Sequence, residues 1–157
     1  MRVLEIERGG ERMRVATYLT DAEIADLRGL PARGVVGVVG EDGVLRVNGV
    51  FREFLHETIA REAPRDPDMQ KAAEARGEGR LVFVDSRVPE EVQPVPEEDV
   101  LGWFAVREGR IVPGSYVANP EHRVEGRYGW SAAIGGMRVP MVRALRAGEG
   151  KSEEPGS

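Results

Sequence analysis

The chain has 157 residues, of which 41% are hydrophobic and 31% charged, and its formal net charge is −5 at pH 7. This length and mixture suit one soluble globular domain, and the acidic balance argues against broad electrostatic binding to nucleic acid or anionic lipid. The absence of cysteine excludes disulfides, thiolate metal sites and a cysteine nucleophile. No apolar run approaches the roughly 20 residues of a membrane helix, and the N-terminus lacks the apolar core of a secretory signal. We therefore expect a cytoplasmic protein without membrane insertion.

A hairpin and a short helix are predicted at the N-terminus. The runs RVLEIE and RMRVATYL alternate apolar and polar residues on either side of the glycine pair at 9–10, a pattern typical of two paired strands. Thr20 and Glu23 have the spacing of a capping box. The sequence thus predicts a helix over residues 21–28, with Gly29 as the C′ glycine.

The next predicted elements are an inner strand and two helices. The glycine-spaced run Val35–Val39 is apolar throughout, which favours a central strand. The run VFREFLHETIAREA carries apolar residues at helical spacing and predicts an amphipathic helix, with His56 on its solvated polar face. Asp66 and Pro67 then begin a further helix that ends before Gly77.

The second half of the chain is predicted to be mostly strand. RLVFVD forms a short apolar strand, and the acidic, proline-bearing run SRVPEEVQPVPEED predicts an exposed, stiff connection. VLGWFAVREGRIVPGSYV predicts a hairpin that turns at residues 108–109. Since Trp103 and Phe104 point to opposite faces, we expect that strand to be covered on both sides. Residues 140–147 predict a final short helix.

Strands outnumber helices, and hairpins outnumber crossovers. This balance predicts the α+β class, with a largely antiparallel (mixed) sheet of six to eight strands and three or four short helices. We expect a single globular domain over residues 1–147 and a disordered polar tail over residues 148–157.

The sequence contains fragments of catalytic and nucleotide-binding motifs, but each lacks a required residue. The GKS of the tail has Leu145 where a phosphate-binding loop needs glycine, and Ala60 stands where a zinc-protease helix needs its second histidine. Asp85 follows an apolar strand and is a candidate acid or metal ligand, but an aspartate there more often bonds its own turn. We assign no catalytic residue, no metal site and no cofactor.

The segment after Pro113-Gly114 is the candidate binding region. Proline cannot donate to a ladder, so the preceding strand is predicted to lie at an edge or to be bulged there. Aromatic, amide and arginine side chains, the types that anchor interfaces, then gather within fifteen residues. The alternative is that the rings cover the sheet edge while the amide and imidazole fix the turn. The predicted contact set is Tyr116, Asn119, His122, Arg123 and Trp130.

Residues 81–130 also resemble a known family. Their short pieces VFVD, GWFAV, GRIV, NPEHR and YGW are similar in order to actinobacterial type VII secretion system-associated proteins of unknown function. The resemblance implies an accessory role in bacteria and carries no catalytic residues.

The leading hypothesis is a non-enzymatic accessory or adaptor domain that binds a protein partner and no nucleic acid. The first alternative is a small enzyme, or a metal- or ligand-binding protein, that uses His122 with a nearby carboxylate such as Asp85. The second is a phage-type inhibitor that covers a host protein. The sequence favours no particular oligomeric state.

Overall fold

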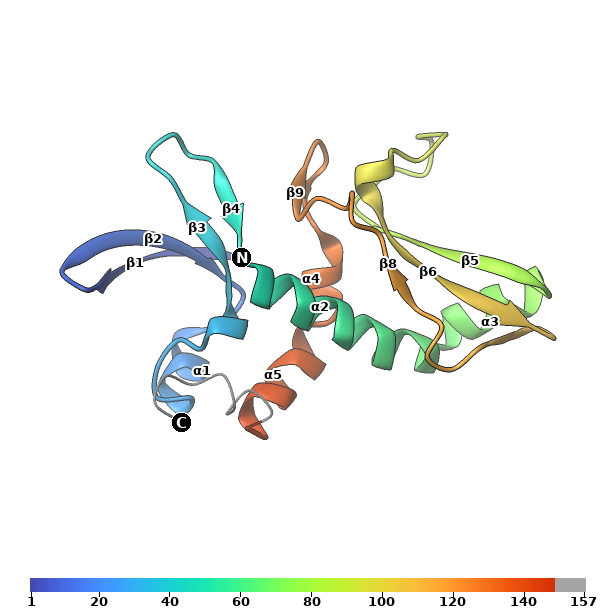
Figure 1. Ribbon diagram of the computed structural model, residues 1–157, viewed down its shortest axis with the longest axis horizontal. Helices are drawn as coiled ribbons and strands as arrows, with labels where there is room; N and C mark the ends of the chain where they lie inside the picture. The colour runs from blue at the N-terminus through green and yellow to red at the C-terminus, as the bar shows by residue number, and fades with distance from the viewer. Residues whose placement is uncertain (149–157) are drawn as a thin grey trace. The chain divides into compact units, whose positions relative to one another are not determined.

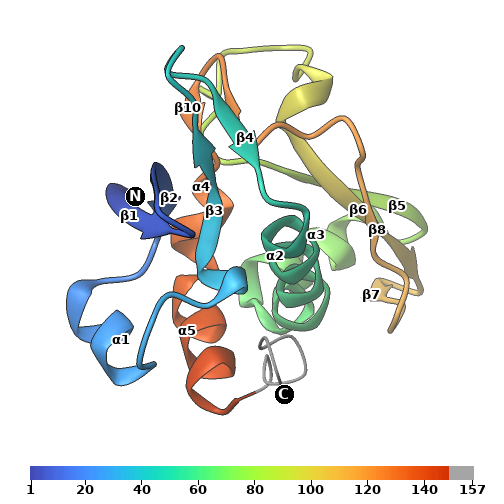
Figure 2. The ribbon, with the colours of Figure 1, turned by 60° about the vertical axis from the view of Figure 1, so that its left-hand side comes forward.

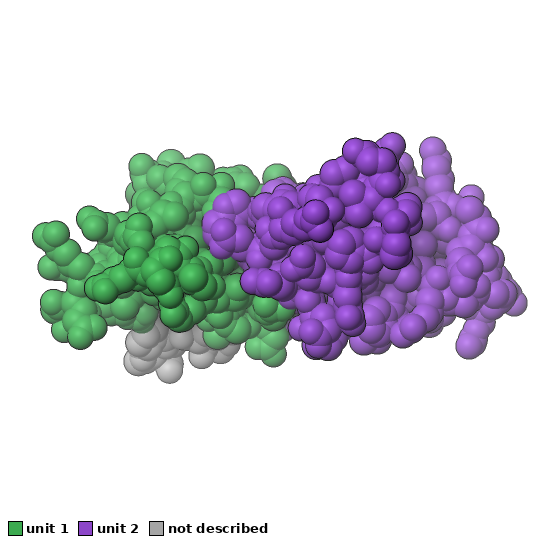
Figure 3. Space-filling view, turned by 90° about the horizontal axis from the view of Figure 1, so that it is seen from above, with its two compact units in different colours: residues 1–55, 137–157 green, residues 56–136 purple. Residues whose placement is uncertain are grey.

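The computed structural model describes residues 1–148, so the predicted disorder of the tail falls, except at Gly148, outside the described residues. Within residues 1–148, ten strands form three antiparallel sheets of four, four and two strands, together with five α-helices (Figure 1). The α+β class and the antiparallel pairing are confirmed. The chain divides into two compact units, unit 1 (residues 1–55 and from 137 onward) and unit 2 (residues 56–136), shown in Figure 3. The single-domain assignment remains a prediction.

Unit 1 is built on a four-stranded sheet in the order β1-β2-β3-β4, so the apolar strand β3 is internal as predicted. The predicted hairpin pairs Leu4 with Val15 and Ile6 with Met13. Gly37 faces the backbone of β4, where any added Cβ would collide with the carbonyl of Arg46. The strands are β1 (Arg2–Arg8), β2 (Glu11–Thr17), β3 (Val35–Val39) and β4 (Leu45–Val47).

The helix α1 (Asp21–Asp26) begins at the predicted capping box, since the Thr20 side chain and the Glu23 carboxylate each accept the other residue's backbone N–H. It ends at Asp26, two residues before the predicted end at Arg28, and its C′ position falls one residue earlier than predicted. Arg28, at φ 58°, holds the left-handed position, and the N–H of Gly29 donates to the carbonyl of Ile24 at 3.0 Å. Gly29 is therefore C″ of this motif and not C′.

Two further helices contribute to unit 1. The helix α2 (Gly49–Glu62) buries Phe51, Phe54 and Leu55 along its first turns. The final helix α5 (Arg138–Arg146) begins two residues before the predicted position and buries Met141. A one-turn 3-10 helix, Ala32–Gly34, precedes β3.

Unit 2 contains the second sheet and the segments that hold it. As predicted, Asp66 caps α3 (Pro67–Arg76), where it accepts the N–H of Asp68 at 3.1 Å, and Gly77 follows the helix. The other elements are a 3-10 turn at Ala63–Arg65, β5 (Gly79–Val84), a 3-10 turn at Glu97–Asp99, β6 (Val100–Arg107), β7 (Arg110–Ile111), β8 (Val117–Ala118), β9 (Glu125–Gly126), β10 (Gly129–Trp130) and α4 (Ala132–Gly136).

The strand β6 is the centre of this sheet, with β5 along one edge and both β7 and β8 along the other (Figure 2). The chain leaves the ladder between β7 and β8, at Pro113-Gly114, as the bulged-edge prediction required. The turn at residues 108–109 is also confirmed, with Glu108 at φ 52° and Gly109 at φ 73°. No helix within residues 1–148 is long and apolar enough to cross a membrane.

Candidate functional site

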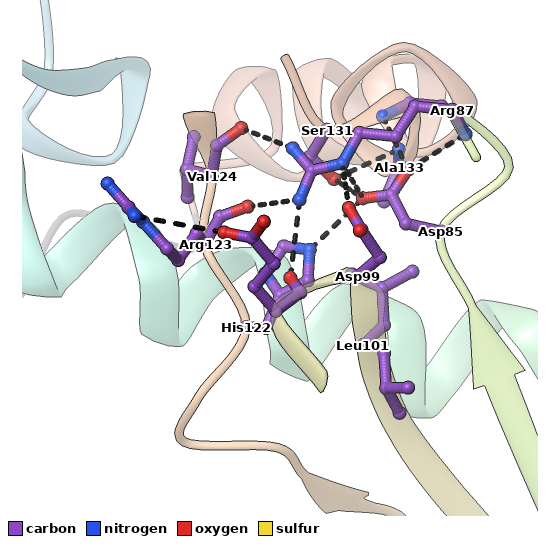
Figure 4. A network of polar contacts seen from close by, with 12 residues as sticks. Asp85, Arg87, Asp99, Leu101, His122, Arg123, Val124, Ser131 and Ala133 are labelled. Carbon is purple, nitrogen blue, oxygen red and sulfur yellow. Dashed lines mark hydrogen bonds and ion pairs between the residues drawn. The ribbon is translucent and has the colours of Figure 1, made fainter. Parts of the chain in front are cut away.

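A buried polar network lies where β5 ends. Oδ2 of Asp85 accepts the hydroxyl of Ser131 at 2.5 Å and lies 3.0 Å from Nε2 of His122 (Figure 4). Oδ1 accepts the backbone N–H of Ala132 at 2.9 Å and that of Arg87 at 3.3 Å. The bond to Arg87 is the turn bond that an aspartate after a strand is expected to make, and the other three bonds tie the strand end to a distant segment.

The hydrogen bonds keep Asp85 ionised. Burial alone would raise its pKa, but the bonds from His122 and Ser131, the N–H of Ala132 and the charge of Arg87 outweigh burial and hold the pKa below its ordinary value. An ionised carboxylate only accepts hydrogen bonds. Nε2 of His122 is therefore the donor in its bond to Asp85.

Arg87 connects the network to the backbone around it. Its side chain is 3% exposed, and Nε donates to Oδ1 of Asp99 at 2.8 Å while lying 3.7 Å from Oδ2 of Asp85. Its remaining donors reach four carbonyl oxygens, those of Glu98, Arg123, Val124 and Gly129, at 2.6 to 3.3 Å. One guanidinium thus fixes the 3-10 turn before β6 and the segment from residue 123 to 129. The predicted exposed connection is consequently buried at both ends, at Arg87 and at Asp99.

The two histidines lie close together inside unit 2. The rings of His56 and His122 meet edge to face, with centroids 6.2 Å apart, and Nδ1 of His56 lies 2.7 Å from the hydroxyl of Tyr116. That hydroxyl also donates to the carbonyl of Leu101 at 3.2 Å, and burial raises the pKa of Tyr116 well above its ordinary value. The prediction that His56 lies on a solvated helix face is wrong, because His56 is 9% exposed and hydrogen-bonded.

The order of the network differs from that of a serine hydrolase. In a catalytic triad the imidazole lies between the hydroxyl and the carboxylate and removes the hydroxyl proton. Here Asp85 lies in the middle, and Ser131 donates to the carboxylate and not to His122. All three residues are at most 3% exposed. The described part of the chain also contains no group of three or more acidic, histidine or cysteine side chains arranged to hold a metal ion. This geometry favours a structural role.

The predicted contact set separates into buried and exposed members. Asn119 and His122 are 5% and 1% exposed, and the Asn119 amide donates to the carbonyls of Glu97 and Val100. Tyr116 turns its hydroxyl inward to His56, as described above. Arg123 is exposed, and both Tyr116 and Trp130 are half-buried, so these three members present the surface of the set. Whether the set binds a partner remains a prediction.

A second candidate site is the face of the β5-β6-β8 sheet that carries Trp103. Val82 pairs with Trp103, and Trp103 pairs with Val117, so the three side chains form one row across three strands. Val82 is 50% and Val117 46% exposed, while Phe104 on the opposite face is 1% exposed. We call Val82, Trp103 and Val117 the apolar row. The expectation that both faces of β6 are covered is wrong for this one.

A cation lies over the aromatic ring of the row. The guanidinium carbon of Arg80 is 4.3 Å from the centroid of Trp103, within cation–π range. No local pattern predicts the row, because RLVFV and GWFAV carry apolar residues on both faces and alternation does not tell which face is left open. The pairing of Trp103 with Val117 also depends on a return of the chain after Pro113-Gly114 that no local pattern specifies.

Comparison with known protein families, with curated proteins and with solved structures found no match to this chain. The observations that bear on function are therefore those of the geometry of unit 2.

Proposed function

We propose that this chain is a non-enzymatic accessory or adaptor domain that binds a protein partner through the apolar row. The observation that carries the proposal is the exposure of Val82 and Val117 on either side of Trp103. Aromatic side chains set among aliphatic ones are the usual anchors of protein interfaces, and a contiguous apolar stripe on a sheet face is a more specific signal than scattered exposed residues.

The buried network supports this function indirectly. A catalyst needs a reactive group that the substrate can reach, whereas the side chains of Asp85 and Arg87 are hydrogen-bonded to other groups of the protein. The same bonds hold the segment that follows β8, and β8 supplies Val117 to the row. We infer that the network makes the binding face rigid.

The resemblance to type VII secretion system-associated proteins is compatible with this role. The residues of the row all fall within 81–130, and two of them belong to the pieces VFVD and GWFAV. We therefore propose an accessory function in a bacterial, cytoplasmic setting. The absence of cysteine supports a reducing compartment.

The test is a comparative affinity enrichment from the source cells with the whole chain as bait. Val82→Thr combined with Val117→Thr keeps the β-branched shape and places hydroxyls in the row. Val3→Thr is the matched control, since Val3 also lies on a strand and is 49% exposed. We expect a partner that wild type and the control enrich and the double variant loses. Equal enrichment by all three baits would refute the proposed surface.

Arg123 and Trp130 define a competing surface for the same partner. If they anchor it, Trp130→Ala or Arg123→Ala weakens binding by about 2 kcal/mol, the scale of an interface hot spot. If the Val82/Val117 variant leaves the interaction intact and these two abolish it, the binding site is the one predicted from the sequence. A partner that is an enzyme inactivated in the complex would identify the chain as an inhibitor.

The second candidate function, a small enzyme or ligand-binding protein that uses His122, is favoured by one observation, the 3.0 Å contact with Asp85. His122→Gln separates the two roles. A structural His122 predicts a loss of stability with partner binding retained at low temperature. A reactive His122 predicts the loss of a measurable activity in a chain that stays folded.

A further inference from the structure

Three arginines lie beside the apolar row on the same face of the sheet. Arg80 is two residues from Val82 on β5, and Arg107 is four residues from Trp103 on β6, so strand alternation places each on the side of the row. Arg110 pairs directly with Arg107 and shares its side. All three are exposed. We call Arg80, Arg107 and Arg110 the arginine group.

No carboxylate of the described residues is ion-paired with the arginine group. Glu78, the nearest acid before β5, uses its carboxylate to accept the backbone N–H of Glu108 at 2.9 Å. Like charges directly opposite each other in a ladder are destabilising, and Arg107 and Arg110 are such a pair. The arginine group is thus a local cluster of positive charge on a chain whose net charge is −5.

We propose that the outer sheet face, made of the apolar row and the arginine group, binds an acidic segment of a partner protein. This inference rests on the proposed function and adds the chemistry of the partner. Apolar side chains of the segment contact Val82, Trp103 and Val117, and its carboxylates pair with the guanidinium groups. Arginine suits this role because its planar fork binds a carboxylate through two parallel hydrogen bonds. Arg80 is held in place by its position over Trp103.

A single-stranded nucleic acid fits this face less well. Bases stack on open aromatic rings, but one face of Trp103 is already covered by Arg80. A second copy of this chain would bring a second arginine group with it. Both remain outcomes that the experiment distinguishes.

The experiment selects peptides on the whole chain from a random peptide library and measures the affinity of a selected, fluorescently labelled peptide by anisotropy. The variants are Arg107→Glu with Arg110→Glu, and Val82→Thr with Val117→Thr. The matched controls are Arg143→Glu, at an exposed position of α5, and Val3→Thr.

We expect the selected peptides to combine aspartate or glutamate with apolar residues. Reversing the charge of Arg107 and Arg110 should weaken binding at least roughly tenfold, because two attractive pairs become repulsive. Binding should also weaken as salt is raised. The controls should bind as wild type does.

The other outcomes overturn one claim or both. Neutral or basic peptides that need Val82 and Val117 but tolerate Arg107→Glu/Arg110→Glu would overturn the acidic partner and leave the proposed function standing. Peptides indifferent to both variant pairs would overturn both claims. Tight binding of a labelled oligothymidylate, lost in the arginine variant, would replace the acidic segment by nucleic acid. A dimer seen by light scattering and dissolved by Val82→Thr/Val117→Thr would replace it by a second copy.

Discussion

The end and the middle of β5 differ in the kind of side chain that they bury. At the end of the strand, Asp85 and Arg87 are buried charges whose partners are supplied almost entirely by the protein. In the middle, Val82 is an apolar side chain left half in water beside Trp103. Charged side chains are buried and apolar side chains are exposed, which is the reverse of the usual distribution in globular proteins.

Each exception carries a cost that needs a reason. A buried charge is tolerated only when its hydrogen bonds are satisfied, and Asp85 accepts four while Arg87 donates to five oxygens. An exposed apolar row has no such compensation inside the chain, which is why we assign it to a partner. The comparison therefore predicts large effects on stability at the strand end and small ones in the row.

The largest expected effect is that of Arg87→Met. Methionine fills similar space but leaves Asp99 and four carbonyl oxygens without their donor. We expect the free energy of unfolding to fall by about 3 to 5 kcal/mol in urea denaturation at pH 7, the cost of breaking a buried ion pair from one side. Arg12→Met on exposed β2 should change it by at most about 0.5 kcal/mol. A similar small loss for both variants would show that the network is not structural.

The next effect concerns Asp85 and has a pH signature. Asp85→Asn should lower the free energy of unfolding by about 2 kcal/mol at pH 7. The substitution replaces a charged acceptor by a neutral one and places an amide group next to Nε2–H of His122. The folded pKa of Asp85 lies below the unfolded value of about 3.9. The contribution of ionised Asp85 to the free energy of unfolding is thus complete above the unfolded pKa and is lost as the pH falls through the folded pKa.

The difference in unfolding free energy between wild type and Asp85→Asn should accordingly shrink as the pH falls below about 4. Urea titrations of both proteins over a pH series measure it. The charge that faces the carboxylate is that of Arg87, and it remains in the variant. A difference that stays constant from neutral to acidic pH would contradict an ionised Asp85.

The local elements were predictable because their causes are local. The capping box at Thr20, the cap at Asp66 and the turn at Glu108-Gly109 each depend on residues within a few positions of one another. The predicted C′ position of α1 is one residue too late, because the sequence favours glycine at the left-handed position and the chain accepts Arg28 there.

The buried network was not predictable, because its partners lie far apart in the sequence. Asp85 meets Ser131 across 46 residues, and Arg87 reaches the carbonyl of Gly129 across 42, so no window of sequence contains both partners. The pairing of His122 with Asp85 was named as an alternative from residue types, and the 3.0 Å contact confirms their proximity, although no local pattern in the sequence specifies it. His56 was misassigned because the helical period places it with charged neighbours, while Tyr116 supplies a buried partner from another part of unit 2.

A smaller effect is expected for Tyr116→Phe, which removes only a hydroxyl from the interior. The ring packs on Phe104, with centroids 4.9 Å apart, and should stay in place. Loss of the bonds to His56 and to the carbonyl of Leu101 should cost about 1 kcal/mol in thermal or urea unfolding. The control is Tyr128→Phe, a half-buried ring whose hydroxyl has no hydrogen bond to a described residue. Equal changes in the two variants would mean that the His56–Tyr116 contact adds nothing.

The smallest effect on stability is predicted where the effect on binding is greatest. Val82→Thr with Val117→Thr keeps the branched shape that strands favour and adds hydroxyls that water can solvate, so unfolding should change by less than about 0.5 kcal/mol. In a complex the same hydroxyls would be buried without a hydrogen-bond partner, which costs about 1 to 3 kcal/mol of binding free energy for each. A variant pair as stable as wild type that no longer binds assigns the row to a partner. A pair that loses several kcal/mol of stability would instead show that the row belongs to the core, and the contrast between the middle and the end of β5 would disappear.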